Sequence, residues 1–365
     1  MKILLACGGT GGHLFPAIGL IPAMQQKHEL FFVTGMSPLE KELLPETHGN
    51  VQRIPSRKLP THFGQWKSWG SFFMDTTAAV KQSFGILRRF HPDLVIGFGG
   101  YASVPVLVAA RCRGIPVLLH EQNIIPGKAN HLLSRWAKGV AVSFPQALPL
   151  WNFHPRVKIT GNPGPLRFRN VGYGVWNFPP PLEEDRFTIL VMGGSQGAHP
   201  INQIVSAALL HWLQVAPEQA KKIQIIHLTG DADFEQVRQT YEKLPMPSYV
   251  TPFHEEMHQL YEVSDLAITR AGATSLSELA YFALPAILIP YPHAGAHQLE
   301  NARIFEQAGA AILLQEKSMA VGILMGAIQS LVTDKAKLRQ MREASIRLSI
   351  ADSDERFLDL VQEVS

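Results

Sequence analysis

One histidine lies where its side chain could accept a proton. His13 directly follows the glycine-rich run at residues 8–12, which itself follows a short apolar run at residues 3–6. An imidazole at a helix start, just past a strand, can point toward a ligand and take a proton from an attacking hydroxyl near neutral pH. Glu121, which follows the apolar run at 117–119, is the rival base. The sequence leaves this choice open, and His13 could instead only cap or pack against the helix start.

A second set of polar residues occurs at a predicted helix start in the second half of the chain. Arg270 follows the apolar run at 266–269 and precedes a run of small and hydroxyl-bearing residues that ends in Glu278. Backbone N–H groups and hydroxyls at the positive end of a helix can bind a diphosphate, and a nearby carboxylate can bind both hydroxyls of a ribose. Gln298, at a later helix start, could reach sugar hydroxyls. The segment predicts a nucleotide site, although Glu278 alone could be a first-turn acid that complements the helix dipole.

Three glycine-rich runs each follow an apolar run and precede a helical pattern, at residues 8–12, 97–100 and 193–197. Glycine permits positive φ and lets backbone N–H groups approach an anion at a helix start. None of the runs is a G-x-G-x-x-G fingerprint, and Thr34 and Gly35 stand where an acid would hold a ribose. Because a Walker A loop is also missing, a nicotinamide dehydrogenase and a nucleoside triphosphatase are both disfavoured.

The composition fits a globular protein with two domains. The chain has 365 residues, of which 46% are hydrophobic and 17% charged, and this length exceeds what one core usually serves. Its formal net charge is +3 without a long Lys/Arg run, so nucleic acid is not an expected partner. Cys7 and Cys112 are too few for a disulfide framework, which favours a reducing compartment. No run approaches the roughly 18 apolar residues of a membrane span, so membrane contact would be peripheral.

The order of apolar runs predicts an α/β fold. Short runs that are apolar throughout are typical of parallel sheets covered on both faces. The expected strands are residues 3–6, 30–33, 94–96, 117–119 and 139–142 in the first half, and 187–192, 223–228, 266–269 and 286–290 in the second. A stretch rich in Pro and Gly at 162–181 is the expected linker. In such sheets ligands bind at the carboxyl ends of the strands, which is where the glycine runs lie.

Metal ligands are not evident in the sequence. No Asp-x-Asp directly ends an expected strand, and no set of His, Asp and Glu has ligand spacing, so neither a catalytic metal nor a cofactor is expected. Helix ends, backbone amides and Arg270 would then have to neutralise the charge of a leaving diphosphate.

Taken together, the motifs resemble the MurG family of bacterial peptidoglycan transferases, in order and over almost the whole chain. The motifs that carry the resemblance are GGTGGH at 8–13, GGY at 99–101 with Ser103 and Pro105, HEQN at 120–123, GNP at 161–163, GGSQGA at 193–198, Arg270 with Gly272 and Ala273, Ser277 with Glu278, and Gln298 with Asn301 and Ala302. The resemblance implies a GT-B fold with two Rossmann-like domains whose parallel sheets face each other across a cleft.

The resemblance also implies a role for each domain and a particular reaction. Residues 1–163 would bind the acceptor and associate with the membrane, with the helix at 344–365 packing back on them, and residues 164–343 would bind the UDP-sugar. The implied reaction moves N-acetylglucosamine from UDP-N-acetylglucosamine (UDP-GlcNAc) to the C4 hydroxyl of the muramoyl sugar of lipid I. Its products are UDP and lipid II, with inversion to a β1-4 linkage, in peptidoglycan synthesis and hence in cell shape and division.

Site residues follow from the resemblance by position. His13 is the suggested base, with Glu121 the alternative. Contacts to the donor or acceptor are implied for Thr10, Gly11, Gly12, Asn123, Ser195, Gln196, Gly197, His254, Arg270, Ala273, Thr274, Ser275, Leu276, Ser277, Glu278 and Gln298. His254 stands where an apolar residue is more usual, so only its backbone contact to uracil is implied. The family usually places Val-Arg after the GNP motif, whereas this chain has Gly164 and Pro165, and Arg167 is the candidate for the missing cation.

Family members work peripherally at the cytoplasmic face of the cell membrane, because their acceptor is lipid-linked, and other cell-wall synthesis proteins are possible partners. Aromatic and basic side chains between residues 66 and 89 offer a surface suited to anionic lipid. They are Trp66, Trp69, Phe72, Phe73 and Met74, with Lys67, Lys81, Arg88 and Arg89. The alternative is that these aromatics belong to the core.

The sequence also allows two other functions. A UDP-N-acetylglucosamine 2-epimerase would pair two similar domains but should carry additional acids and bases around its glycine runs. A non-catalytic membrane-recruitment protein with a degenerate fold would be expected to have lost His13 and Glu278.

Overall fold

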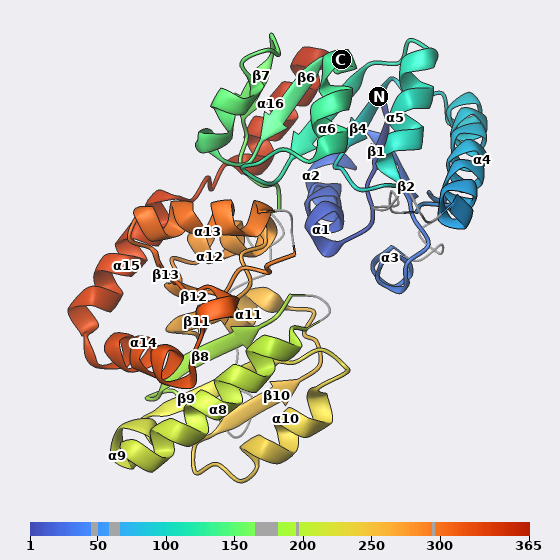
Figure 1. The fold of residues 1–365 in the computed structure, drawn as a ribbon. Helices are drawn as coiled ribbons and strands as arrows, with labels where there is room; N and C mark the ends of the chain where they lie inside the picture. Colours follow the sequence, from blue (N-terminus) through green and yellow to red (C-terminus); the bar gives the residue numbers. More distant parts are fainter. Residues whose placement is uncertain (45–49, 58–65, 165–181, 195–196, 294–295) are drawn as a thin grey trace. The chain divides into compact units, whose positions relative to one another are not determined.

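The computed structural model describes the chain except residues 45–49, 58–65, 165–181, 195–196 and 294–295, and except the side chains of 66–68 (Figure 1). The chain divides into two compact units. Unit 1 comprises Met1–Asn170 and Ile350–Ser365, and unit 2 comprises Val171–Ser349. Most of the linker expected at 162–181 lies outside the described residues.

Unit 1 is built on a parallel sheet of seven strands in the order β3-β2-β1-β4-β5-β6-β7. The strands are β1 (Lys2–Ala6), β2 (Glu29–Thr34), β3 (Val51–Arg53), β4 (Leu94–Gly97), β5 (Val117–Glu121), β6 (Gly139–Val142) and β7 (Val157–Ile159). All five strands expected from apolar runs are present. The two edge strands β3 and β7 were not expected, because they are short, only partly buried and interrupted by polar residues.

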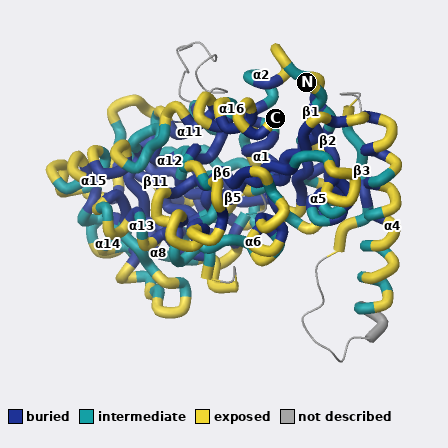
Figure 2. Tube along the Cα trace, turned by 90° about the horizontal axis from the view of Figure 1, so that it is seen from above, coloured by how far each residue is buried: buried dark blue, intermediate teal, exposed yellow. Residues whose placement is uncertain are grey.

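Helices cover both faces of this sheet, and successive strand residues point to opposite faces. Ile3 and Leu5 pack on one side with α1 (Gly11–Gly19), α2 (Ile21–Met24) and α16 (Ser353–Val364). Leu4 and Ala6 pack on the other side with α4 (Trp66–Phe90), α5 (Ser103–Cys112), α6 (Lys128–Leu133) and the 3-10 helix η3 (Pro145–Trp151). A short helix, α3 (Pro38–Leu43), follows β2. Figure 2 shows the strands β1 and β2 as buried and much of α4 as exposed.

Unit 2 repeats this plan with a parallel sheet of six strands in the order β10-β9-β8-β11-β12-β13. The strands are β8 (Phe187–Met192), β9 (Ile223–Leu228), β10 (Ser248–Thr251), β11 (Leu266–Thr269), β12 (Ala286–Leu288) and β13 (Ala311–Leu313). The helices are α8 (His199–Val215), α9 (Pro217–Ala220), α10 (Phe234–Tyr241), α11 (Met257–Glu262), α12 (Ala273–Tyr281), α13 (His297–Gln307), α14 (Val321–Thr333) and α15 (Lys335–Arg347). The edge strands β10 and β13 were again not expected from the sequence.

The helix expected over 344–365 is in fact two elements. Residues up to Arg347 complete α15, which contacts α12 in unit 2, and a new helix, α16, begins at Ser353 in unit 1. Five consecutive polar residues, 352–356, follow the break and lead into α16. Phe357, Leu360, Val361 and Val364 of α16 are buried against the unit 1 sheet.

Each sheet reverses its strand order at one point, and the reversal places loops at the carboxyl ends of adjacent strands. In unit 1 this point lies between β1 and β4, and in unit 2 between β8 and β11. Doubly wound sheets bind ligands at such points. In the part of the chain that the structure describes, no helix has the length and apolar character needed to cross a membrane.

Candidate active site

The first glycine loop is held by a buried acid that the sequence did not single out. Glu40 of α3 is 2% exposed and accepts hydrogen bonds from three backbone N–H groups. Its Oε1 accepts from Gly9 at 2.8 Å and from Gly35 at 3.1 Å, and its Oε2 accepts from Ser37 at 2.6 Å. Ser37 and Glu40 form a capping box, which is the one sequence signal that could have marked this residue. Glu40 thereby ties the exit of β1 to the exit of β2.

The second glycine run packs directly on the first. Gly100 has φ +81°, and a Cβ added there would lie 1.8 Å from the carbonyl oxygen of Gly8. Gly99 has φ +92°, and a Cβ there would lie 3.1 Å from the imidazole of His13. Both positions need glycine for conformation and for space. The close approach brings the β4 exit against the start of α1.

His13 lies in the first turn of α1 and is partly buried. Its Nδ1 is 3.1 Å from Oε1 of Gln122, just past the end of β5. Thr10 is the N-cap of α1, and both Thr10 and Gly12 are exposed beside it, whereas Gly11 is buried. The structure therefore gathers His13 and exposed backbone at the carboxyl edge of the unit 1 sheet.

Glu121 lies in a different environment. It is 1% exposed, and four N–H hydrogen bonds saturate its carboxylate. Its Oε1 accepts from the backbone and the side chain of Asn123 at 3.1 and 3.3 Å. Its Oε2 accepts from the Gly127 backbone at 2.9 Å and from Asn130 Nδ2 at 3.0 Å. These bonds fold the turn between β5 and α6, with Asn123 partly buried in it.

In unit 2, the loop after β8 is shaped by close backbone packing. A Cβ added to Gly193 would lie 2.2 Å from the Ala198 nitrogen, and one added to Gly197, which has φ +73°, would lie 2.1 Å from the Thr229 carbonyl oxygen. The predicted site residues Ser195 and Gln196 lie outside the described residues, as does Arg167.

A buried polar network lies behind this loop. Asn202 of α8 donates from Nδ2 to the Thr229 carbonyl at 2.9 Å and to Asp233 at 2.7 Å. His227 lies 3.0 Å from Asn202 Oδ1 and 2.9 Å from the Tyr241 hydroxyl, and burial lowers the pKa of His227 to about 3. The network holds Thr229, the residue against which Gly197 packs.

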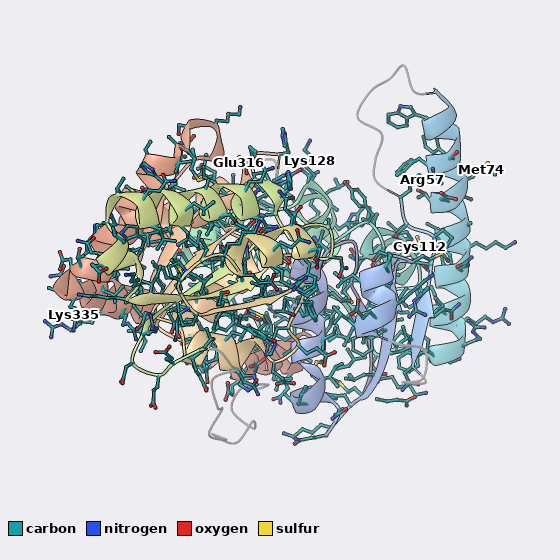
Figure 3. The ribbon with its side chains drawn as sticks, turned by 90° about the horizontal axis from the view of Figure 1, so that it is seen from below. Arg57, Met74, Cys112, Lys128, Glu316 and Lys335 are labelled. Atoms are coloured by element: carbon teal, nitrogen blue, oxygen red, sulfur yellow. The ribbon has the colours of Figure 1, made fainter. Side chains whose placement is uncertain are left out.

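Arg270 already has a carboxylate partner. It is 7% exposed, and its Nη1 is 2.5 Å from Glu316 Oε2 and donates to the Ile289 carbonyl at 3.1 Å. Its guanidinium also lies 5.4 Å from the ring centroid of Tyr291. Figure 3 labels Glu316 on unit 2. Arg270 thus joins the exits of β11 and β12 to the segment after β13, and no sequence motif indicated this ion pair.

Helix α12 presents the predicted nucleotide-binding residues. Gly272 is its N-cap, Ala273 and Leu276 are buried, and Thr274, Ser275, Ser277 and Glu278 are partly buried. Because α12 has no acid in its first turn, the alternative of Glu278 as a first-turn acid does not fit. The buried Tyr261 of α11 donates its hydroxyl to Glu278 Oε2 at 2.8 Å.

Gln298 and His254 complete the predicted set. Gln298, in the first turn of α13, accepts at Oε1 from the backbone N–H groups of Ala271 at 3.3 Å and of Tyr291 at 2.9 Å. It therefore joins the loops after β11 and β12. His254 lies in the segment between β10 and α11, and burial lowers its pKa below the ordinary value.

Acidic side chains in the described residues do not assemble a metal site. No group of three or more His, Cys, Asp or Glu is placed to hold an ion there. The chain has Asp-x-Asp at 231–233 and at 352–354. Asp233 is bonded to Asn202 and His199, and Asp354 accepts from the Gly164 backbone at 2.9 Å.

The chain matches two family models that together span most of its length. Residues 3–142 match the glycosyltransferase family 28 N-terminal domain, and residues 188–358 match the glycosyltransferase family 28 C-terminal domain. The chain therefore belongs to glycosyltransferase family 28, and its two Rossmann-like units are those of the GT-B fold.

More specific similarity comes from individual proteins. A Syntrophotalea carbinolica protein is 38% identical over 372 residues, covering 100% of this chain and 99% of the relative. It is named UDP-N-acetylglucosamine--N-acetylmuramyl-(pentapeptide) pyrophosphoryl-undecaprenol N-acetylglucosamine transferase. The crystal structure of Acinetobacter baumannii MurG superposes with a TM-score of 0.73 at 28% identity and 99% coverage of both chains. A structure of a putative Listeria monocytogenes UDP-N-acetylglucosamine 2-epimerase has a TM-score of 0.72, covers 100% of this chain and 96% of its own, and at 12% identity shares the fold alone.

The Tyr261–Glu278 hydrogen bond gives a test of the nucleotide site on α12. Glu278→Ala should weaken UDP binding by removing the ribose contacts. Tyr261→Phe should raise the UDP Kd roughly three- to tenfold, since an orienting hydrogen bond contributes about 1 kcal/mol. Isothermal titration calorimetry with UDP measures both variants and their combination.

In the Glu278→Ala background, Tyr261→Phe should have no further effect, because Tyr261 acts through Glu278. Thr188→Val is the control, since Thr188 is equally buried and its hydroxyl bonds to Gln224 near the start of β8, at the opposite end of the sheet. This placement of the nucleotide would be contradicted if Tyr261→Phe lowered UDP affinity equally in the unaltered chain and in Glu278→Ala. Unchanged UDP affinity in Glu278→Ala would also contradict it.

Proposed function

We propose that this chain transfers N-acetylglucosamine from UDP-GlcNAc to the C4 hydroxyl of the muramoyl sugar of lipid I. The products are lipid II, with a β1-4 linkage, and UDP. The observation that carries the proposal is the full-length similarity to curated relatives named for this transferase activity. The arrangement of polar groups in the two units supports this function. It suits donor binding by unit 2 and activation of the acceptor hydroxyl by unit 1.

Unit 2 binds the donor. The loop after β8 and the start of α12 offer backbone N–H groups at helix ends, where an anionic diphosphate is stabilised. Glu278, oriented by Tyr261, accepts hydrogen bonds from the two ribose hydroxyls. Gln298 is held beside the start of α12 through Ala271, and its amide is available for a sugar hydroxyl. Arg270 shapes these loops through its ion pair with Glu316.

Unit 1 presents the nucleophile. His13 takes the proton from the C4 hydroxyl while that oxygen attacks the anomeric carbon of the donor sugar. The bond from the anomeric carbon to the UDP oxygen breaks on the opposite face, so the configuration inverts and UDP leaves with the bonding electron pair. Glu121 is a poor base in comparison, because both of its oxygens already accept two N–H hydrogen bonds. Its role is to fold the β5–α6 turn that carries Asn123.

The proposed chemistry uses no metal ion. Helix ends and backbone amides stabilise the charge that develops on the leaving diphosphate, as preorganised dipoles do in other transfer reactions. Activity should therefore persist when divalent ions are chelated.

Incubation of the full chain with UDP-GlcNAc and a lipid I analogue tests the function directly. The expected result is equimolar UDP and a disaccharide-linked lipid, with rates unchanged by EDTA. An epimerised sugar nucleotide without the acceptor would identify an epimerase. No turnover at all would favour a binding protein, and activity that disappears with EDTA would contradict the metal-free mechanism.

The role of His13 has its own test. His13→Ala should lower kcat by about 10²–10⁴-fold, the contribution of a general base, while UDP affinity changes little. Glu121→Gln is the comparison variant, and its effect should appear mainly as lost thermal stability. Near-normal turnover in His13→Ala together with inactivity in a folded Glu121→Gln would assign the base to Glu121.

The lipid-linked acceptor requires a membrane-facing surface, and we place it on α4. Phe73 is 59% exposed and Met74 is 75% exposed, and Trp69 and Phe72 pack around Phe73 with ring centroids 6.0 and 5.8 Å from it. Figure 3 shows Met74 on the outer side of the helix. Large exposed apolar side chains in one cluster are typical of an interaction surface.

Basic residues extend this surface along the helix. Met74, Lys81 and Arg88 are spaced by seven residues and all exposed, so they lie along one side of α4. Aromatic residues at one end with cations toward the other suit a helix lying on anionic lipid. Trp66 and Lys67, also named from the sequence, have side chains outside the described set. Association with the cytoplasmic face of the membrane, and with other cell-wall synthesis proteins, is part of this proposal.

Vesicle binding tests the surface. The double variant Phe73→Ser, Met74→Ser should bind vesicles of anionic phospholipid at least about a hundredfold more weakly, since burying each of the two side chains contributes about 1.5–3 kcal/mol. Ile323→Ser and Ile346→Ser, at exposed apolar positions of unit 2, are the controls. Vesicle affinity unchanged in the α4 variant would rule out this surface.

A further inference from the structure

Two backbone carbonyls in unit 1 determine the direction of a chain of hydrogen bonds that ends at His13. The carbonyl oxygen of Gly161 lies 3.1 Å from Nε2 of His120, and that of Phe98 lies 2.9 Å from Nε2 of Gln122. A carbonyl oxygen only accepts hydrogen bonds, so both nitrogens must be donors. The proton positions of the remaining links follow from these two.

His120 is neutral, and its tautomer is fixed. It is fully buried, and burial lowers its pKa to about 4, so it carries a single ring proton at neutral pH. That proton lies on Nε2, which donates to Gly161, and Nδ1 therefore has a lone pair. Nε2 of Gln122 lies 3.0 Å from this Nδ1 and donates its second proton there.

The amide of Gln122 is consequently held in one orientation. Both of its N–H protons are used, toward Phe98 and His120, and rotating the amide by 180° would place its oxygen against the Phe98 carbonyl. Gln122 is 1% exposed, so water cannot replace these partners. Its Oε1 must face His13, and at 3.1 Å from Nδ1 it can only accept.

We propose that Gln122 is a positioning residue that holds the proton of neutral His13 on Nδ1 and thereby leaves the lone pair on Nε2. The inference rests on the proposed role of His13 as base and names what prepares that base. An imidazole can take a proton only at its unprotonated nitrogen, and the hydrogen bond at the other nitrogen decides which one that is. His120 and the two carbonyls act on His13 only through the Gln122 amide.

Packing keeps the imidazole in place along with its tautomer. The ring lies against the backbone of Gly99 and Gly100, where any side chain would collide with it or with Gly8. The ring is therefore positioned by glycine backbone on one side and by the Gln122 oxygen at Nδ1. Rotating the ring by 180° would put Cδ2 in the place of Nδ1 and break the bond to Gln122.

The tautomer can be measured without any turnover. Long-range ¹H–¹⁵N NMR of the full chain labelled at histidine nitrogens, assigned with a His13→Gln variant, should show protonated Nδ1 and unprotonated Nε2 for His13 above its titration. In Gln122→Met, which keeps the length of the side chain and removes the acceptor, the proton should move largely to Nε2. The same tautomer in both proteins, or a proton on Nε2 in the unaltered chain, would overturn the proposal.

Kinetics provide the second readout. Gln122→Met should lower kcat roughly ten- to a hundredfold, a part of the effect of removing the base, while the KM for UDP-GlcNAc stays nearly constant. Gln122→Glu should move the acid limb of the kcat profile to higher pH, because a carboxylate beside the ring favours its charged form. Two results would contradict the positioning role. One is an unshifted pH profile in Gln122→Glu, and the other is a KM in Gln122→Met that rises as much as kcat falls.

A matched control separates positioning from stability. Gln224 in unit 2 is a fully buried amide that bonds to Glu183 and Thr188, so Gln224→Met has a similar structural cost without touching a histidine. It should leave the His13 tautomer and kcat unchanged.

The inference and the proposed function can fail separately. If His13→Ala turns over normally while Gln122→Met still shifts the His13 tautomer, His13 is not the base, but Gln122 still sets its tautomer. If His13 is required for turnover but its tautomer is the same in Gln122→Met, His13 remains the base and the positioning role of Gln122 is removed.

Discussion

Backbone N–H groups at the carboxyl ends of the two sheets need hydrogen-bond acceptors, and how that need is met organises the candidate site residues within each unit. Buried main-chain donors are almost always paired. Three side-chain acceptors do this here, namely Glu40 at the β1 and β2 exits, Glu121 at the β5 exit and Gln298 at the β11 and β12 exits. Each fixes the shape of a loop at the carboxyl edge of its sheet.

The same local architecture serves different chemistry in the two units. Each has a parallel sheet with a reversal of strand order and a glycine loop at that point. In unit 1 the loop is followed by His13, whose ring is oriented by neutral hydrogen-bonding groups. In unit 2 the corresponding region carries Arg270, Glu278 and many hydroxyls, which suits a charged diphosphate and a ribose. We propose that the first unit moves a proton and that the second binds the charged diphosphate.

The fold could be predicted from the sequence where burial alone decides structure. Central strands such as β1 and β8 are apolar at nearly every position because both of their faces are covered. The edge strands β3, β7 and β10 lack that signal, because one of their sides has no neighbouring strand and their residues are mixed. The edge strand β13 is apolar but only three residues long, and it was not expected either. The break between α15 and α16 was missed although a run of five polar residues, 352–356, marks it.

The candidate site could be located but not resolved from the sequence. His13 and Glu121 look equivalent as polar residues that follow a strand, and only the four N–H donors around Glu121 distinguish them. The partners of Arg270 and Glu278 lie 46 and 17 residues away along the chain, at Glu316 and Tyr261, so no local pattern could reveal them. Gln122 was visible only as part of a motif, because its role depends on two backbone carbonyls that the fold brings beside it.

We propose above that unit 2 holds an activated sugar through main-chain amides and Glu278. A crystal structure of the chain with UDP tests this most directly. We expect the diphosphate to lie against the loop at 193–197 and the start of α12, with both ribose hydroxyls within hydrogen-bond distance of Glu278. Nucleotide density elsewhere on the chain, or a ribose that does not contact Glu278, would contradict it.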